Sequence, residues 1–285
     1  MRIDGNTKTC VLLGDPVEHT LSPVIHSALA EFTGINMVYV PCRVKAEDME
    51  SAIKGAFALN ILGLNVTIPH KEQAIPLLCE TDKLAEKIGA VNTLVRMNDG
   101  YKGFNTDMPG LCRAMKSDGI RIQDENVIVF GAGGVARAVV VMLCDKANHI
   151  YIVNRTIKRA KEIANEVNAY VGRRVAEAIC LDEYVLIPDG RYLAIQATNV
   201  GMYPHCEEAV VNDLQFIKKI HTCYDLIYNP EKTRFMQLVE KAGGKAYNGL
   251  KMLLYQGIIA FELWNDVAIT DEQANLVYER LRKSL

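Results

Sequence analysis

Several patterns that would place a chain of 285 residues in another class of protein are missing from this sequence. Its eight cysteines form no CxxC pair and its six histidines no HxxxH or HExxH, so the sequence offers no metal site. Cysteines spaced in this way suit buried thiols in a reducing compartment better than disulfides. The N-terminus lacks the basic-then-apolar order of a signal peptide, and no apolar run approaches the ~20 residues of a membrane span. We therefore expect a cytoplasmic protein with no membrane partner.

An excess of charge of one sign is also missing. The net charge is −2 at pH 7, which gives no general attraction to nucleic acid. Apolar residues make up 49% and charged residues 23% of the chain, as in ordinary globular proteins. The sequence contains no short internal repeat and no low-complexity segment. The length allows a sizeable core and predicts two domains.

Both halves of the chain alternate short apolar runs with helical patterns. In the first half we expect strands at 10–13, 36–40 and 63–68, with helices at 24–29, 46–59 and 71–78. A second series follows, with strands at 127–130, 150–153, 193–196, 223–226 and 245–247 and late helices at 255–267 and 271–281. This alternation predicts mostly parallel sheets. The expected fold is α/β, with two three-layer α/β/α domains and an interdomain cleft.

The second half carries a glycine-rich motif, GAGGVARA at 131–138, between an expected strand and an expected helix. Gly131 and Gly133 would let backbone N–H groups approach a pyrophosphate, and the helix N-terminus adds a favourable dipole. The same motif occurs in plain strand-to-helix turns. A second strand that ends about twenty residues later favours dinucleotide binding over such a turn.

The residues after that second strand indicate which dinucleotide is bound. An NAD site would place an acid there to hold the ribose hydroxyls, but 154–159 reads NRTIKR and has none. Guanidinium groups and a hydroxyl bind a 2′-phosphate, which a carboxylate would repel. A solvated basic helix start would look similar. The lysine and two arginines at this point favour NADP.

Polar side chains gather at the expected strand ends of the first half. Each alone suits a cap or a turn, but open α/β sheets bind ligands at the C-terminal ends of their strands. Hydroxyls, amides, one lysine and one acid together suit a small polyol that carries a carboxylate. The set comprises Thr20, Ser22, Asn65, Thr67, Lys71, Asn92 and Asp107.

Over nearly its whole length the chain resembles the shikimate dehydrogenase family. The stretches that carry the resemblance are HTLSP (19–23), NVTIPHK (65–71), GAVNT (89–93), GFNTD (103–107), GAGGVARA (131–138), NRTIKR (154–159), ATNVGM (197–202), DLIYNP (225–230) and NGLKMLLYQ (248–256). The resemblance implies a reversible, NADPH-dependent reduction of 3-dehydroshikimate to shikimate, in the shikimate pathway of aromatic amino acid biosynthesis. It also implies that residues 1–108 plus 248–285 form a substrate-binding catalytic domain, and residues 109–247 a Rossmann-like NADP-binding domain.

The resemblance further implies roles for individual residues. The catalytic pair falls on Lys71 and Asp107. Substrate contacts fall on Thr20, Ser22, Asn65, Thr67, Asn92, Tyr228 and Gln256. Cofactor contacts fall on Gly131, Ala132, Gly133, Gly134, Val135, Asn154, Arg155, Thr156, Lys158, Arg159, Thr198, Met202, Leu226 and Gly249.

Physical chemistry gives the pair at 71 and 107 a purpose. Reduction of a ketone leaves negative charge on oxygen, which an ammonium group stabilises and to which it delivers a proton. Asp107 would hold Lys71 and one substrate hydroxyl in position. Burial lowers a lysine pKa and a nearby carboxylate raises it, and the sequence does not decide between them.

The sequence leaves some alternatives open. Thr20 stands where the family usually has serine, so the preference between shikimate and quinate is undecided. A quinate/shikimate dehydrogenase using NAD would carry an acid soon after Arg155, and none is present. A methylenetetrahydrofolate-type dehydrogenase would not need Asn92, Asp107 and Gln256 together. A non-catalytic sensor of metabolite and nucleotide would not need Lys71. Monomer and homodimer both fit.

Overall fold

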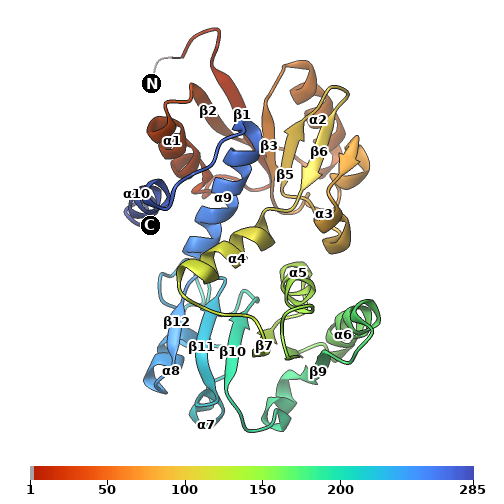
Figure 1. Ribbon diagram of the computed structural model, residues 1–285, viewed down its shortest axis with the longest axis vertical. Helices are drawn as coiled ribbons and strands as arrows, with labels where there is room; N and C mark the ends of the chain where they lie inside the picture. The colour runs from red at the N-terminus through yellow and green to blue at the C-terminus, as the bar shows by residue number, and fades with distance from the viewer. Residues whose placement is uncertain (1–2) are drawn as a thin grey trace. The chain divides into compact units, whose positions relative to one another are not determined.

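The computed structural model describes residues 3–285 and divides into two compact units. Unit 1 is formed by the described part of Met1–Ala114 together with Lys251–Leu285, and unit 2 by Met115–Leu250. Each unit is built on a six-stranded sheet flanked by helices, so the predicted pair of α/β domains is confirmed (Figure 1). Both boundaries between the units fall inside helices, α4 (Asp107–Ser117) and α9 (Leu250–Asn265).

The sheet of unit 1 has the strand order β2-β1-β3-β5-β6-β4. Its strands are β1 (Lys8–Gly14), β2 (Met37–Arg43), β3 (Gly63–Val66), β4 (Glu80–Thr81), β5 (Thr93–Arg96) and β6 (Tyr101–Phe104). Strand β1 pairs in parallel with β2 and β3, whereas β5 runs antiparallel to both β3 and β6. The sequence patterns missed β5 and β6, because each has only four residues. The signal that could have found them is the Asn98-Asp99-Gly100 turn between them.

The two faces of this sheet follow from the alternation of side chains along its strands. Leu64 and Val66 belong to the cluster of buried side chains that includes those of α2 (Met49–Ala58). Asn65 therefore points to the other face, where Trp264 of α9 donates an Nε1 hydrogen bond to the carbonyl oxygen of Leu94 at 3.0 Å. The remaining helical segments of unit 1 are α1 (Ser22–Thr33), α3 (Lys83–Ile88), α10 (Asp271–Arg282) and the 3-10 turns Ala46–Asp48 and Ile75–Leu77.

Unit 2 has a sheet of six parallel strands in the order β12-β11-β10-β7-β8-β9. Numbered from its first strand this order is 6-5-4-1-2-3, which is that of a Rossmann fold. The strands are β7 (Asn126–Phe130), β8 (His149–Asn154), β9 (Ala176–Cys180), β10 (Tyr192–Gln196), β11 (Ile220–Asp225) and β12 (Lys245–Tyr247). The helical segments are α5 (Gly134–Leu143), α6 (Ile157–Val171), α7 (Leu214–Ile217), α8 (Arg234–Lys241) and the 3-10 segment Leu181–Leu186.

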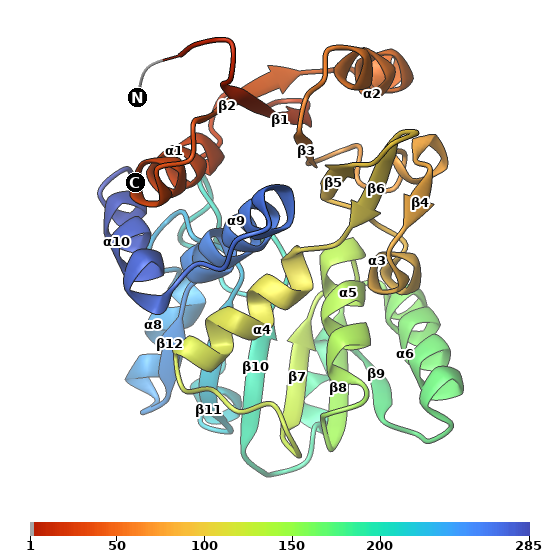
Figure 2. The same cartoon turned by 45° about the horizontal axis from the view of Figure 1, so that its top comes forward.

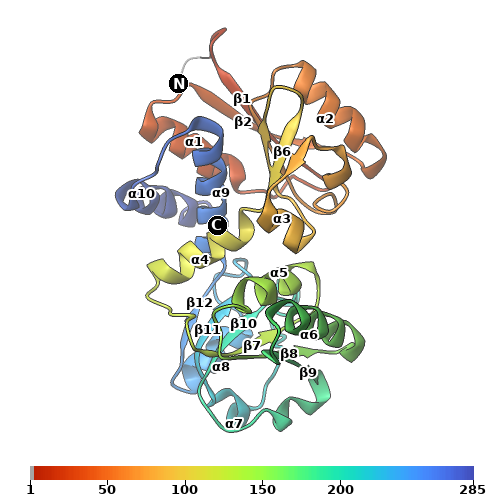
Figure 3. The same cartoon turned by 45° about the vertical axis from the view of Figure 1, so that its right-hand side comes forward.

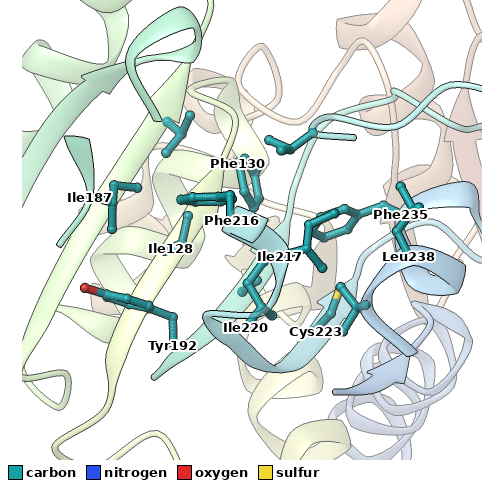
Figure 4. Close-up of a cluster of buried hydrophobic side chains, with 14 of the residues drawn as sticks. Ile128, Phe130, Ile187, Tyr192, Phe216, Ile217, Ile220, Cys223, Phe235 and Leu238 are labelled. Atoms are coloured by element: carbon teal, nitrogen blue, oxygen red, sulfur yellow. The ribbon is translucent and has the colours of Figure 1, made fainter. Parts of the chain in front are cut away.

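Helices α5 and α6 lie side by side in unit 2 (Figures 2 and 3). A separate cluster of buried side chains joins the sheet to α7 and α8 (Figure 4). In it the rings of Phe130 on β7 and Phe235 on α8 meet edge to face, with centroids 5.4 Å apart. Such pairs add to the free energy gained by burial, so the strands that end at the glycine-rich loop rest on a packed support.

Two local expectations were wrong. The segment 71–78 is a turn followed by the short 3-10 helix Ile75–Leu77, because Pro76 and the hydrogen bonds around Lys71 do not continue an α-helix. The helix expected at 255–267 begins earlier, at Leu250, and ends at Asn265. Among residues 3–285 no helix combines the length and the apolar character that crossing a membrane requires.

Candidate active site

Three segments of unit 1 meet at one edge of its sheet. Asn65 at the end of β3 is paired with Thr93 at the start of β5, and Thr93 is paired with Phe104 at the end of β6. The antiparallel course of β5 therefore brings the segments 65–71, 92–93 and 104–107 to the same edge. The end of β1 lies beside the end of β3, since Leu13 pairs with Val66, so the loop that leads to α1 starts at this edge too.

Lys71 and Asp107, predicted as a pair from the sequence, are in contact. The Nζ atom of Lys71 lies 2.6 Å from Oδ2 of Asp107, and the two side chains are 27% and 18% exposed. Asn92 donates a hydrogen bond from Nδ2 to Oδ1 of the same carboxylate at 2.8 Å. Asp107 is the first residue of α4, where the helix dipole favours a negative charge. Both carboxylate oxygens thus accept a hydrogen bond, and one N–H of Lys71 is used.

The orientation of the Asn92 side chain is fixed by a group that can only donate. The backbone N–H of Thr106 lies 2.7 Å from the Asn92 side-chain oxygen, which must therefore be the acceptor. The hydroxyls of Thr106 and Thr93 lie 3.2 Å and 3.3 Å from the same oxygen. The amide nitrogen consequently faces Asp107, and it can only donate a hydrogen bond to that carboxylate.

Asn65 is held on every side by protein. Its Oδ1 accepts from the hydroxyl of Tyr39 at 2.8 Å, and its Nδ2 donates to the carbonyl of Asn92 and the hydroxyl of Thr93, each at 3.0 Å. Both N–H groups are therefore used, and Asn65 can reach a ligand only through its oxygen. Burial raises the pKa of the Tyr39 hydroxyl, which keeps it a neutral donor.

The residues Tyr39, Thr93 and Thr106 were not identified as site residues from the sequence. Thr93 and Thr106 stand inside the motifs GAVNT and GFNTD, so the signal was their place beside Asn92 and Asp107. Tyr39 lies on β2, 26 positions before Asn65, and only the sheet brings the two together.

The backbone around Lys71 is fixed by its neighbours. The carbonyl of Lys71 accepts from the N–H of Val91 at 2.9 Å. The preceding residue, His70, is fully buried, and its Nε2 lies 2.7 Å from the carbonyl oxygen of Val44. Because a carbonyl only accepts, Nε2 carries the proton in this bond. These contacts direct the lysine without the helix that the sequence pattern predicted.

The hydroxyls predicted near the start of α1 are also together. Thr20 Oγ1 and Ser22 Oγ are 3.1 Å apart. Helix α1 begins at Ser22 itself, and no side chain caps it. Thr67 packs closely on the end of β1, since a Cβ at Gly14 would lie 2.3 Å from its Cγ2. Gln256 lies on α9, where its Nε2 donates to the carbonyl of Leu253 at 2.8 Å.

The glycine-rich loop of unit 2 has the space that a dinucleotide needs. Gly131 has φ +115°, which other residues rarely adopt, and a Cβ there would lie 3.0 Å from the carbonyl oxygen of Ala197. A Cβ at Gly133, the N-cap of α5, would meet nothing within 4 Å. Ala132, Gly134 and Val135 complete the turn into this ten-residue helix. The open surface and the helix N-terminus fit a pyrophosphate.

The basic segment predicted to select NADP follows β8. Asn154 ends the strand and donates from Nδ2 to the carbonyl oxygen of Thr156 at 3.0 Å. Arg155, Lys158 and Arg159 are exposed, and none forms an ion pair with a carboxylate among residues 3–285. Cations without a carboxylate beside them suit a phosphate ester.

The other residues predicted around the cofactor follow β10, β11 and β12. The N–H of Thr198 donates to the side-chain oxygen of Gln196 at 2.5 Å. The N–H of Leu226 donates to the backbone oxygen of the same residue at 2.9 Å. Gly249 donates from its N–H to the carbonyl of Ile227 at 3.0 Å, and a Cβ there would lie 2.1 Å from the oxygen of Leu226.

Two predicted residues differ in their surroundings. Met202 is exposed, whereas Tyr228 is partly buried and has a pKa raised by that burial. Tyr228 belongs to unit 2, and the other predicted substrate residues belong to unit 1.

Comparisons with known proteins show the family to which the chain belongs. Residues 12–94 match the family model described as shikimate dehydrogenase substrate binding domain, and residues 113–184 match that of shikimate / quinate 5-dehydrogenase. A shikimate dehydrogenase (NADP(+)) of Desulforamulus reducens is 38% identical, over 99% of this chain and 98% of its own.

Solved structures are similar over the same length. The crystal structure of a shikimate dehydrogenase in complex with NADP+ has a TM-score of 0.90 at 36% identity, over 99% of this chain and 97% of its own. A shikimate 5-dehydrogenase from Listeria monocytogenes, in complex with shikimate and NAD, has a TM-score of 0.89 at 28% identity, over 99% of this chain and 98% of its own.

Proposed function

Because the chain belongs to the shikimate dehydrogenase family, we propose that it catalyses the reversible, NADPH-dependent reduction of 3-dehydroshikimate to shikimate. This reaction is a step in the biosynthesis of aromatic amino acids. One observation carries the proposal for this chain: an ammonium group and a carboxylate meet at the ligand-binding edge of a sheet, with Asn92 holding the carboxylate. We also propose that the protein acts in the cytoplasm.

Each residue of this cluster has a task in the reaction. NADPH, when bound, would supply the hydride, which would leave negative charge on the substrate oxygen. Lys71 uses one N–H on Asp107 and keeps two to stabilise that oxygen and transfer a proton to it. Asp107 holds Lys71 in place, and its remaining lone pairs can accept from a substrate hydroxyl. Asn92 holds Asp107 in turn, by donating to its Oδ1.

Unit 2 offers residues that would hold NADP. Gly131 allows the tight turn, Gly133 leaves open space for the pyrophosphate, and the start of α5 would present backbone N–H groups to it. Arg155 and Arg159 would bind the 2′-phosphate of the adenosine ribose through their guanidinium groups. Thr198, Met202, Leu226 and Gly249 would border the rest of the cofactor.

The test is NADPH oxidation, followed by absorbance, after addition of 3-dehydroshikimate. We expect Lys71→Ala to lower kcat by at least about 100-fold, because it removes the proton donor, and to leave the Kd for NADPH unchanged. Lys54→Ala is the matched control, since Lys54 also pairs with a carboxylate, Glu50, at 2.6 Å but on the exposed surface of α2. Turnover by Lys71→Ala at the wild-type rate would contradict the proposal.

The same assay separates the alternative functions. Rates on shikimate and quinate, each with NADP and with NAD, distinguish the proposed enzyme from a quinate/shikimate dehydrogenase. The NAD complex of the Listeria relative makes the NAD arm worthwhile. A sensor would bind both ligands and turn over neither.

The chain is compatible with a monomer and with a homodimer. Light scattering would decide between these two oligomeric states.

A further inference from the structure

One fully buried carboxylate in unit 2 has no part in the proposed reaction. Asp225 is the last residue of β11 and is 0% exposed. It lies in register with Gln196, the last residue of β10, which is also 0% exposed. Lone carboxylates are costly to bury, so the place of this one calls for a physical reason.

The hydrogen bonds of Asp225 join the two ends of one loop. Its Oδ1 accepts from the backbone N–H of Ile227 at 3.0 Å, and its Oδ2 accepts from the hydroxyl of Thr233 at 2.6 Å. Thr233 is itself fully buried and is the N-cap of α8, where its hydroxyl accepts from the N–H of Met236. A single side chain therefore fixes where the loop 227–233 leaves the sheet and where it enters the helix.

Tyr228 lies within this loop, directly after the residue whose N–H is held. The loop also touches the segment after β10, where the N–H of Tyr203 lies 3.5 Å from the carbonyl oxygen of Asn229. Leu226, by contrast, is held by the backbone oxygen of Gln196 and needs no help from Asp225. The carboxylate of Asp225 thus fixes the part of the loop that carries Tyr228. It does not hold Leu226, which is predicted to border the cofactor.

The charge state of Asp225 follows from its surroundings. The buried thiol of Cys223 lies two positions earlier on β11, and its pKa is raised by burial and by Asp225. The side chain paired with Asp225 on β10 is the neutral Gln196. No cation forms an ion pair with Asp225 in the part of the chain that the structure describes. Burial raises the pKa of Asp225 to about 6, and the hydrogen bonds from Thr233 and Ile227 oppose that rise.

We propose that Asp225 is a positioning residue, which acts through the loop 227–233 to hold Tyr228 in the orientation that binds substrate. This inference rests on the proposed function, because it takes Tyr228 as a substrate contact. Asp225 thus contributes to substrate binding, although it touches neither substrate nor cofactor. Its replacement should change the KM for 3-dehydroshikimate and leave the Kd for NADPH unchanged.

The first experiment compares three variants with the wild-type enzyme. We expect Asp225→Ala to raise the KM for 3-dehydroshikimate about tenfold or more, since it removes two hydrogen bonds to a charged group, and to keep the Kd for NADPH within about twofold. Asp225→Asn keeps the shape and can serve both partners, so it recovers most of the loss. Asp213→Ala is the control: Asp213 accepts from the N–H of Gln215 at 2.8 Å, at the opposite end of β11. It should leave both constants unchanged.

Two further readouts separate positioning from a general loss of structure. The double variant Asp225→Ala with Tyr228→Phe should have the KM of Tyr228→Phe alone, because Asp225 acts through that tyrosine. As pH falls from 7 to 5 and Asp225 takes up a proton, the wild-type KM should also rise toward that of Asp225→Asn, whose own KM should show no such step. Losses that multiply in the double variant, or matching pH profiles in the two proteins, would overturn the inference.

Failure of the inference is distinct from failure of the proposed function. A wild-type protein that does not oxidise NADPH with 3-dehydroshikimate refutes the function. A wild-type enzyme that does so, beside an Asp225→Ala variant of equal KM, refutes the inference. If Asp225→Ala does not fold, Thr233→Val removes one of the two hydrogen bonds and Thr233→Ser restores it. The KM must then rise in the first and return in the second, and an equal KM in both is the refuting result.

Discussion

Gly110 lies where the helices that carry Asp107 and Gln256 approach each other closely. A Cβ at Gly110 of α4 would lie 2.7 Å from the backbone N and 2.9 Å from the Cα of Gln256 on α9. Carbon contacts lie at about 3.5–4.0 Å, so the added methyl is about 0.6 Å too close to that Cα, which cannot rotate away. Gly110→Ala must therefore push α4 and α9 apart.

The free energy of this change can be worked out with a matched control. Overpacking costs about 1–3 kcal/mol, and replacing a helical glycine with alanine returns about 1 kcal/mol. Gly55 in α2 is a helical glycine whose added Cβ would meet nothing within 4 Å, so Gly55→Ala gives the gain alone. The difference between the two variants is then the overpacking cost, about 1–3 kcal/mol.

The assay uses the one tryptophan of the chain. Trp264 lies on α9 in unit 1 and is 5% exposed, so its fluorescence during denaturant unfolding reports on this unit. Gly110→Ala should shift the midpoint down and Gly55→Ala should shift it up, with turnover of 3-dehydroshikimate reduced only in the first. Equal midpoints in the two variants would refute the close approach and the reasoning built on it.

Two more predictions concern pH and cofactor. Burial lowers the pKa of His26, stacked on Tyr39, from 6.5 to about 3. As pH falls below 6.5, His26 therefore takes up a proton in the unfolded chain but not in the folded chain. The stability present above pH 6.5 is lost as pH falls toward 3. When the free energy of unfolding, followed by Trp264 fluorescence, is plotted against pH, His26→Phe should lower the slope by about 1.4 kcal/mol per pH unit. Parallel curves for the wild type and the variant would contradict this. Replacing Arg155 and Arg159 together with alanine should weaken NADP binding by about tenfold or more and spare NAD, as measured by fluorescence titration; equal losses would count against 2′-phosphate recognition.

The sequence predicted those parts of the molecule that depend on local patterns. The two α/β domains and five of the six parallel strands of unit 2 followed from the alternation of apolar runs, whereas β9 was missed. Lys71 and Asp107 followed from motifs. The hairpin of β5 and β6 was missed because two strands of four residues leave little periodicity. The orientation of Asn92 was beyond sequence reasoning, because it depends on hydrogen bonds between residues brought together only by strand pairing. The role of each predicted contact residue stays a prediction until it is measured.

The placement of α9 has a consequence for biosynthesis. Unit 2 is one continuous stretch that is complete at Leu250, whereas unit 1 needs Lys251–Leu285 to cover its first 114 residues. Trp264 packs on Gly63 and donates to Leu94, so the face of the sheet begun earliest stays uncovered until α9 has been synthesised. On the ribosome, the middle of this polypeptide can therefore fold before its beginning. A chain terminated shortly after Leu250 would expose an apolar sheet, and chaperones would recognise it as unfinished.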